Sequence, residues 1–359
     1  METHENFFAG KIIMITGGLG FIGSNLAVRL SKLNPKKIIL VDSLVPGLGG
    51  SMENIDEIKN NPIVEIYCGL EGDIKNKEKM KPLIFESDII FNLAGSIKHT
   101  KLDEKELEFD TDVNFLSQVK FLEYCRQVMI ENHEKKLKLV FAGTRDQYGK
   151  VPMDKLPVKE DYLPKFLTDY QSISKNAAES YHMVINNVLR DSGIDIKINS
   201  IRLINTYGPM QLGNVGAAIP VFVSKAIKND VIELWGGGEV FRDVNYIDDV
   251  VDAFFIVASS DCNGEIFNLG SCAGKFGMEN PIGENFLSIK KIAEKIVKIS
   301  GKGKIKIIPY PAERKSIEPG HFAADISKIF NLGWFPKISL DEGLKKTIEW
   351  HKSKTFFVE

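Results

Sequence analysis

The feature that most constrains this chain is a glycine-rich turn between a short apolar run and a helical pattern. "KIIMIT" (11–16) has the length and apolar composition of a buried strand, and "GGLGFIG" (17–23) follows it directly. Gly17, Gly20 and Gly23 are spaced GxxGxxG. Glycine lets a backbone turn tightly and approach a pyrophosphate, which the N–H groups and dipole of a following helix then stabilise. The stretch therefore predicts a strand–turn–helix unit suited to a dinucleotide.

Further short apolar runs alternate with helical patterns over the first 200 residues. Five more strand candidates lie at 36–42, 62–69, 88–95, 138–144 and 196–203, and helical patterns lie at 21–33, 77–85, 112–131 and 174–192. Runs that are apolar on both faces are typical of strands covered by helices on both sides. The pattern predicts an α/β fold with a Rossmann-type, doubly wound parallel sheet. Ligands bind such sheets beyond the carboxyl ends of the strands; here these ends carry Thr16, Asp42, Gly95, Thr144 and Asn205.

Asp42 supports the dinucleotide interpretation. It closes the second strand candidate 19 residues after Gly23, where a carboxylate can accept hydrogen bonds from an adenosine ribose. A carboxylate at this place repels a 2′-phosphate, and no arginine follows it. The sequence therefore favours NAD over NADP as the cofactor.

Composition excludes several other classes of protein. The 46 basic and 48 acidic side chains nearly balance, so charge does not indicate a nucleic-acid or membrane partner. The four cysteines have neither CxxC spacing nor a nearby histidine pattern, so we expect no metal site. The N-terminus places acidic residues before its short apolar run and does not resemble a secretion signal, so we expect a cytoplasmic protein.

Motifs along nearly the whole chain resemble the extended short-chain dehydrogenase/reductases, specifically the NAD-dependent nucleotide-sugar epimerase/dehydratase group. "TGGLGFIG" (16–23), "GDI" (72–74) and "NLAG" (92–95) are similar to its cofactor loops, and "GTRDQYG" (143–149) to the stretch with its catalytic Ser or Thr. "RLINTYGP" (202–209), "FRDVNYIDDVVDA" (241–253) and a C-terminal "AADISKIFNLGW" resemble its substrate motifs. The resemblance implies oxidation of a sugar hydroxyl by NAD, followed by epimerisation, dehydration, decarboxylation or release of the ketone.

The resemblance also implies roles for individual residues. Those implied for the cofactor are Gly17, Gly20, Phe21, Ile22, Gly23, Asp42, Ser43, Asp73, Ile74, Leu93, Ala94, Gly95 and Lys175. Those implied for the substrate are Thr144, Arg145, Asn205, Arg242 and Arg314. Arg242 and Arg314 would bind diphosphate, because a forked guanidinium suits phosphate geometry; surface ion pairs are the alternative for both.

Two sets of side chains depart from the family pattern. The family keeps a catalytic tyrosine four residues before its lysine, but this chain has Gln171 before Lys175, and an amide has no titratable proton. The acid pair that follows the threonine in the family's dehydratases is here Arg145 and Asp146, which argues against a standard 4,6-dehydratase. Tyr170, Asp146 and His99 are alternative bases; Asp146 could instead pair with Arg145, and His99 could be a solvent-exposed loop residue.

The resemblance implies two domains and a dimer. Residues 1–203 would form the NAD-binding Rossmann domain, with 243–270 returning to it, and 204–242 with 271–359 a smaller nucleotide-sugar-binding domain. The helices at 112–131 and 174–192 carry more apolar residues than one sheet-facing side needs, so they predict a homodimer interface or additional core. Three functions remain open: an epimerase acting through oxidation at C4, a nucleotide-sugar dehydrogenase, reductase or dehydratase with an atypical base, and a catalytically impaired binding protein.

Overall fold

The computed structural model describes residues 2–96, 104–212, 217–272, 281–311, 318 and 320–355. The chain forms two compact units: residues 1–144, 170–202 and 251–267 in the first, and 145–169, 203–250 and 268–359 in the second. Residues 145–169 thus group with the second unit, although the predicted boundary placed them in the first. The reason is a small apolar cluster, in which Tyr148 and Val158 pack with Ile204 and Phe322.

A seven-stranded sheet forms the centre of the first unit, in the order β10-β6-β5-β4-β1-β2-β3. The strands are β1 (Ile12–Thr16), β2 (Lys37–Asp42), β3 (Val64–Cys68), β4 (Ile89–Asn92), β5 (Leu137–Thr144), β6 (Ile196–Leu203) and β10 (Ile266–Asn268). The pairs β1–β2, β2–β3, β1–β4 and β4–β5 are parallel. All six predicted strands are present, and the order reverses between β1 and β4, so the doubly wound Rossmann-type fold is confirmed.

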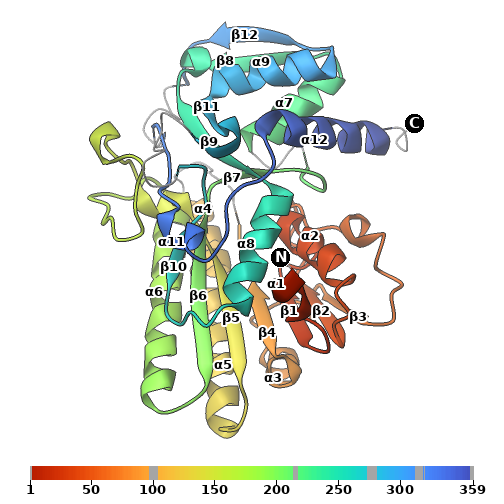
Figure 1. The fold of residues 1–359 in the computed structure, drawn as a ribbon, viewed down its shortest axis with the longest axis vertical. Helices are drawn as coiled ribbons and strands as arrows, with labels where there is room; N and C mark the ends of the chain where they lie inside the picture. The colour runs from red at the N-terminus through yellow and green to blue at the C-terminus, as the bar shows by residue number, and fades with distance from the viewer. Residues whose placement is uncertain are drawn as a thin grey trace. The chain divides into compact units, whose positions relative to one another are not determined.

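Helices cover the sheet because alternate strand residues point to opposite faces. On one face, residues such as Met14, Ile39 and Leu139 pack with the buried sides of helices α3 (Lys77–Glu86), α5 (Ser117–Glu131) and α6 (Tyr170–Asp191). Figure 1 shows α5 and α6 running along β5 and β6. The remaining helices of this unit are α1 (Glu2–Asn6), α2 (Phe21–Leu30), α4 (Glu104–Asp110), the π-helix η2 (Thr111–Leu116) and the second half of α8 (Ile247–Ser259).

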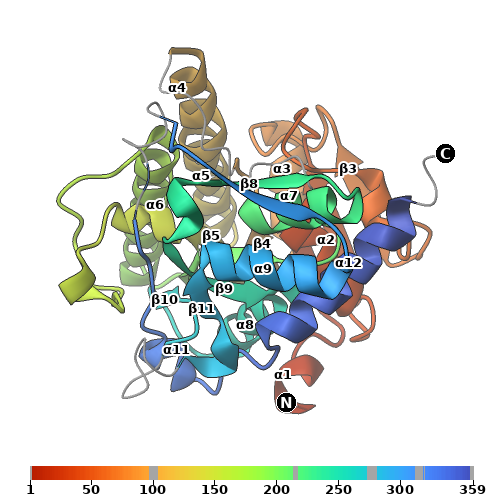
Figure 2. The ribbon, with the colours of Figure 1, turned by 90° about the horizontal axis from the view of Figure 1, so that it is seen from above.

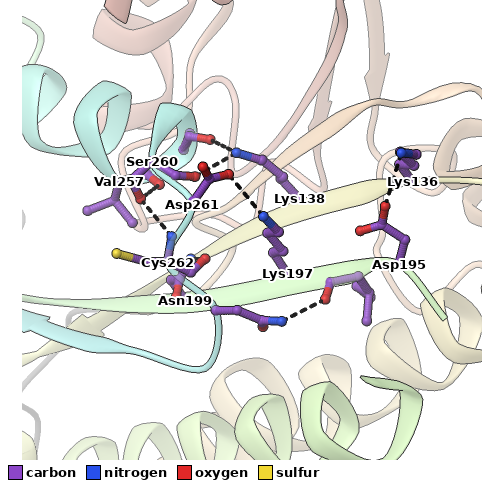
Figure 3. A network of polar contacts seen from close by, with 12 residues as sticks. Lys136, Lys138, Asp195, Lys197, Asn199, Val257, Ser260, Asp261 and Cys262 are labelled. Atoms are coloured by element: carbon purple, nitrogen blue, oxygen red, sulfur yellow. Dashed lines mark hydrogen bonds and ion pairs between the residues drawn. The ribbon is translucent and has the colours of Figure 1, made fainter. Parts of the chain in front are cut away.

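The returning segment 251–267 is held to the sheet by apolar and polar contacts. Phe254 of α8 packs edge-on against Phe91 of β4, with ring centroids 5.9 Å apart. At the end of α8, Lys138 of β5 donates to the carbonyl oxygens of Ala258 and Ser260, at 3.0 and 2.7 Å. Figure 3 shows this lysine beside the exposed pair formed by Lys197 and Asp261. Lys138 therefore satisfies carbonyls that a helix leaves without partners at its C-terminus.

The second unit contains two small sheets and a group of helices. β7 (Asn205–Tyr207), β9 (Phe241–Tyr246) and β11 (Phe286–Ser288) form one sheet in the order β11-β9-β7, and β8 (Val231–Trp235) pairs in parallel with β12 (Lys304–Ile308). Helices α7 (Ala218–Ile227), α9 (Ile289–Ser300) and α12 (Leu340–Thr355) pack on one another, as Figures 1 and 2 show. The short helix α11 is Ser327–Phe330, and 3-10 turns of this unit lie at Arg145–Tyr148, Met153–Lys155, Gly236–Gly238 and Ile282–Glu284; a further 3-10 turn, Met52–Ile55, belongs to the first unit.

Helix α9 shows how local sequence sets these elements. The side chain of Ser288 accepts a hydrogen bond from the backbone N–H of Lys291 at 3.2 Å, which caps the N-terminus. Gly301 ends the helix in the left-handed region with φ 69°, which glycine adopts without steric cost. Ile292, Ala293 and Ile296 form its buried side. In the part of the chain that the structure describes, no helix is both long and apolar enough to cross a membrane.

Candidate active site

The glycine-rich turn joins β1 to α2 with backbone atoms in very close approach. Gly17 has φ +67°, and a Cβ on this residue would lie 3.0 Å from the carbonyl carbon of Leu93. A Cβ on Gly23 would lie only 2.2 Å from the carbonyl oxygen of Gly17. Both positions therefore require glycine. Helix α2 begins at Phe21, directly after the turn, and Ile22 is its second residue. The turn presents backbone N–H groups at a helix N-terminus, which is the arrangement that a pyrophosphate needs.

Asp42 connects this turn to the end of β2. Its carboxylate accepts hydrogen bonds from the backbone N–H of Leu19 at 3.1 Å and of Leu44 at 2.9 Å. Burial raises the pKa of Asp42, and these backbone donors oppose that rise. The carboxylate thus holds the loop residues on both sides of it, including Ser43, in a fixed position.

Residues 69–74 lie against the same strand end. The backbone N–H of Gly69 donates to the carbonyl oxygen of Asp42 at 3.1 Å. Asp73 accepts a hydrogen bond from the backbone N–H of Lys75 at 2.8 Å, and Ile74 is buried in the core. The structure thus places Asp73 and Ile74, which we expect near the adenine, close to Asp42, which we expect near the adenosine ribose.

A buried polar network fixes the loop after β4, which contains Leu93, Ala94 and Gly95. The hydroxyl of Thr16 donates to Asn92 Oδ1 at 2.7 Å and accepts from the backbone N–H groups of Leu93 and Ala94, each at 3.1 Å. Gln118 of α5 donates to the carbonyl oxygen of Ala94 at 2.8 Å. The network therefore ties the carboxyl ends of β1 and β4 to helix α5.

Lys175 of α6 reaches the same loop from the other side. Its side chain is 5% exposed, and Nζ donates to the carbonyl oxygen of Ala142 in β5 at 3.2 Å. A Cβ on Gly95 would lie 2.8 Å from this Nζ, so the end of the lysine packs directly against the glycine. Burial lowers the pKa of Lys175 to about 8, and the charge of Asp110 opposes that shift. Thr144, which ends β5 two residues after Ala142, lies on the same face of the strand.

Gln171 occupies the position one helical turn before Lys175. It is 2% exposed, and its Nε2 donates to the carbonyl oxygen of Ser96 at 2.9 Å. Among the described residues, its Oε1 has no hydrogen-bond partner. Tyr170, the first residue of α6, is only half-buried. Because the helix starts regularly, the glutamine and not Tyr170 faces the loop after β4.

Two residues beside Lys175 were not predicted from the sequence. Asn114 accepts a hydrogen bond from the backbone N–H of Ser96 at 2.7 Å and donates to Asp110 at 2.8 Å. Asn114 lies in the π-helix Thr111–Leu116, a local form that frequently marks functional sites. A signal was present: residues 110, 114 and 118 are polar at helical spacing, on the side where apolar residues would face the sheet.

In the second unit, Arg145 and Asp146 form the ion pair that the sequence left open, with Nη2 3.5 Å from Oδ1. Arg145 also lies over the ring of Phe322, 5.3 Å from its centroid. Tyr148 is fully buried and donates to Asn268 Oδ1 at 2.6 Å. Asp146 is thus paired with Arg145, and Tyr148, two residues later, is fixed in the apolar cluster.

Arg242 lies buried at the start of β9. Its guanidinium pairs with Glu318 and donates to the carbonyl oxygen of Gly320, and Tyr310 donates to the other oxygen of Glu318 at 2.6 Å. Burial lowers the pKa of Arg242, and the charge of Arg145 acts in the same direction. The side chain is 8% exposed, so this is a buried ion pair and not the surface pair considered above.

Asn205, His99 and Arg314 are the remaining site residues predicted from the sequence. Asn205 begins β7, and its Oδ1 is buried without a hydrogen-bond partner in the described part of the second unit. His99 and Arg314 lie outside the described residues. The described residues contain no group of three or more His, Cys, Asp or Glu side chains arranged to hold a metal ion.

Together, the reversal of strand order, the glycine cradle and Asp42 define a dinucleotide-binding α/β protein, and a Cβ at Gly17 or Gly23 would fill the cradle. Residues 13–270 match the model of the NAD dependent epimerase/dehydratase family. The chain belongs to this family, so it is an NAD-dependent enzyme.

Individual relatives cover nearly the whole chain. A putative UDP-glucose 4-epimerase of Methanocaldococcus jannaschii is 30% identical over 95% of this chain and 99% of its own length. A UDP-N-acetyl-alpha-D-glucosaminuronate decarboxylase of Bacillus cytotoxicus is 29% identical over 95% and 98%. The crystal structure of UDP-glucose 4-epimerase from Thermotoga maritima, solved with UDP-glucose, superposes with a TM-score of 0.77 at 25% identity, covering 96% of this chain and 99% of that one.

Proposed function

We propose that this protein oxidises a hydroxyl group of a nucleotide-diphosphate sugar at C4 and reduces the resulting ketone on the opposite face, as an epimerase. The observation that carries the proposal is the placement of Lys175, buried against Gly95 at the carboxyl ends of β4 and β5. Gly17, Gly23 and Asp42 supply a pyrophosphate cradle and a ribose acceptor beside it. In this proposal the first unit is the NAD-binding domain.

Bound NAD supplies a hydride acceptor, and the protein supplies position and proton transfer. Lys175 would donate hydrogen bonds to the ribose of the cofactor, and Thr144 would hold the reacting oxygen of the sugar. Asp42 carries a negative charge toward the adenosine side, which favours NAD over a cofactor with a 2′-phosphate.

In the second unit, Arg242 and Asn205 support the nucleotide-sugar part of the proposal. Arg242 presents a forked guanidinium whose partner in the structure is a carboxylate, Glu318, and a phosphate can occupy the same fork. Asn205 keeps a buried oxygen without a partner, which a ligand hydroxyl or N–H can satisfy. Two relatives are named for reactions of UDP-sugars, which supports a nucleotide-diphosphate sugar as the substrate class.

Epimerisation is favoured over 4,6-dehydration by the residues after Thr144. A dehydratase needs a carboxyl pair to remove and return protons, whereas here Arg145 stands in the first of the two positions and pairs with Asp146. An ion-paired aspartate keeps its proton less readily and is a poor general acid.

The test is incubation of the purified protein with UDP-, dTDP-, GDP- and CDP-sugars, followed by mass spectrometry, chromatography of the sugars and absorbance at 340 nm. An isomer of unchanged mass, without net absorbance change, is expected. A product lighter by one water would show that the reaction is dehydration, and a product lighter by carbon dioxide that it is decarboxylation. Accumulation of NADH would show net oxidation. Binding of NAD and a sugar nucleotide without any product would overturn the enzymatic proposal.

We also propose that the protein is a homodimer through α5 and α6. Helix α6 exposes Ile173, Val184 and Val188 at 52%, 57% and 50%, and Tyr181 lies between them at 46%. These residues recur at helical spacing and form an apolar stripe, which we call the α6 stripe. A second copy of the chain can bury this stripe without any new element. A cytoplasmic location stays a prediction.

A further inference from the structure

We propose that Lys175 is itself the proton acceptor in sugar oxidation, and that Gln171 fixes the loop after β4 beside it without taking part in the proton transfer. This inference rests on the proposed function, because it names the base for that reaction. Residues of the first unit carry it, and it answers why an amide can stand where the family has a phenol.

The surroundings of Lys175 favour a neutral amine. Its Nζ has three possible donors but, among the described residues, makes one hydrogen bond, to the carbonyl oxygen of Ala142. The Phe141 ring, whose centroid lies 5.0 Å from Nζ, favours the ammonium and opposes the effect of burial. Within the described residues, Nζ makes no ion pair with a carboxylate. A buried ammonium without a paired carboxylate is costly, so the neutral form gains population.

Among the described residues, Lys175 interacts electrostatically with Asp110 and His182. Asp110 of α4 attracts the ammonium through its charge, while it accepts a hydrogen bond from Asn114. His182, two turns further along α6, is kept neutral by burial and is disfavoured as a cation by the charge of Lys175. Burial outweighs Asp110, so the pKa of Lys175 falls to about 8. A base with such a pKa is partly neutral under physiological conditions.

Gln171 contributes an acceptor that the protein leaves unsatisfied. Its Nε2 is engaged by the carbonyl oxygen of Ser96, which fixes the orientation of the amide and leaves Oε1 buried without a partner among the described residues. In the described part of the site, no water-sized space reaches this buried oxygen, so Gln171 holds the loop after β4 through Nε2 and takes no part in the proton transfer.

In this step the sugar hydroxyl would give its proton to the unshared pair of Nζ, and bound NAD would supply the acceptor for the hydride released as the carbinol C–H bond breaks. The product would be a ketone, and Lys175 would become an ammonium. Gln171 exchanges no proton, because an amide has no titratable proton. Reduction of the ketone runs the same transfers in reverse.

The first test compares wild type with Lys175→Arg, which keeps the positive charge but cannot become neutral. The first-turnover rate at 340 nm, measured at saturating NAD and sugar nucleotide, should fall about 100-fold or more, and calorimetry with NAD and UDP sets the concentrations that saturate each protein. In the wild type this rate should rise with pH and level off above the pKa of Lys175. The ionisation of Nζ itself can be followed by ¹⁵N NMR of lysine-labelled protein, with K175R to assign the signal.

A second variant distinguishes a lysine that accepts the proton from one that only supports the structure of the site. Lys175→Cys alkylated with bromoethylamine restores an amine on a thioether stem, which titrates at lower pH than lysine. Recovered activity should then show its pH midpoint at lower pH, and wild type alkylated in the same way controls for Cys68, which is exposed. A K175R rate within about tenfold of wild type, or an unmoved midpoint, would overturn the lysine role while the epimerase proposal stands. Wild type that binds both ligands but yields no product fails the proposed function itself.

Discussion

The side-chain amide of Gln171 donates to the carbonyl oxygen of Ser96 across 2.9 Å, which fixes the residue at the family's tyrosine position toward the loop after β4. Replacing Gln171 by Tyr restores the family's phenol. Because Lys175 accepts the proton in our proposal, Q171Y should leave turnover unchanged or lower it, since the larger ring must fit a site that is 2% exposed. Steady-state kcat across the sugar panel is the measurement. A higher kcat would show that the missing phenol limits the chemistry.

Gly23→Ala should weaken NAD binding, because its Cβ would lie 2.2 Å from the carbonyl oxygen of Gly17 and must push the turn away from α2. We expect a loss of about tenfold or more in affinity, equivalent to about 1.4 kcal/mol. Gly20→Ala is the matched control, since its Cβ would lie 3.2 Å from the same oxygen. Isothermal calorimetry with NAD compares the two. Equal affinities would show that the close approach does not shape the cofactor site.

Arg242→Met should reduce affinity for UDP by about tenfold or more and leave NAD binding intact, because the change removes a forked cation from the second unit. Arg242→Lys should recover only part of the affinity, since an ammonium lacks the fork. Arg190→Met, on the exposed side of α6, is the control. If UDP binds R242M as tightly as wild type, Arg242 serves only its pair with Glu318.

His182 should make the protein acid-sensitive. Its ring lies between Asn92 and the carbonyl oxygen of Ala178, and burial lowers its pKa to about 3. The unfolded chain therefore binds more protons than the folded one between pH 3 and about 6.5, so the stabilisation is present above pH 6.5 and is lost as pH falls.

Denaturant midpoints measured from pH 7 to 4 check this expectation. The free energy of unfolding of His182→Gln should fall less steeply with acid than that of wild type, by on the order of 1 kcal/mol or more across this range. His133→Gln, at an exposed position, should follow wild type. Identical slopes for H182Q and wild type would contradict the assignment.

The α6 stripe predicts the oligomeric state. Val184→Glu combined with Val188→Glu places two charges on the stripe and should convert a dimer into a monomer in analytical ultracentrifugation. Phe85→Glu, an exposed apolar residue of α3 at 54%, controls for added charge. A double variant that sediments like wild type would exclude α6 as the interface.

Sequence patterns predict the large sheet but not the small ones, for physical reasons. β1, β2, β4, β5 and β6 are largely buried apolar runs and β3 is a partly buried one, so their composition identifies them. β7 and β11 have three residues each, too few for a period to show, and their partners are distant in sequence. The exchange of 145–169 into the second unit depends on long-range packing of Tyr148 and Val158, which local patterns do not encode.

The site was predicted to a similar depth. Glycine spacing located the cradle, and helical spacing put Gln171 and Lys175 on one side of α6. Asn114 and Asp110 were missed although residues 110, 114 and 118 are polar at helical spacing, because this spacing does not show which strand-end loop that side of the helix meets. That Oε1 of Gln171 is unsatisfied could be seen only once the amide had a definite partner.

The late return of residues 251–267 to the first unit sets an order on biosynthesis. The end of α8 that Lys138 caps, and the strand β10 that joins the sheet, emerge from the ribosome only after about 250 residues have been made. Domains generally fold as units during synthesis, N-terminal first. Here the nascent first unit keeps Phe91 of β4 without its Phe254 partner until the second unit has begun to appear. A truncated transcript that stops before α8 therefore encodes an incomplete sheet rather than a smaller version of the cofactor domain.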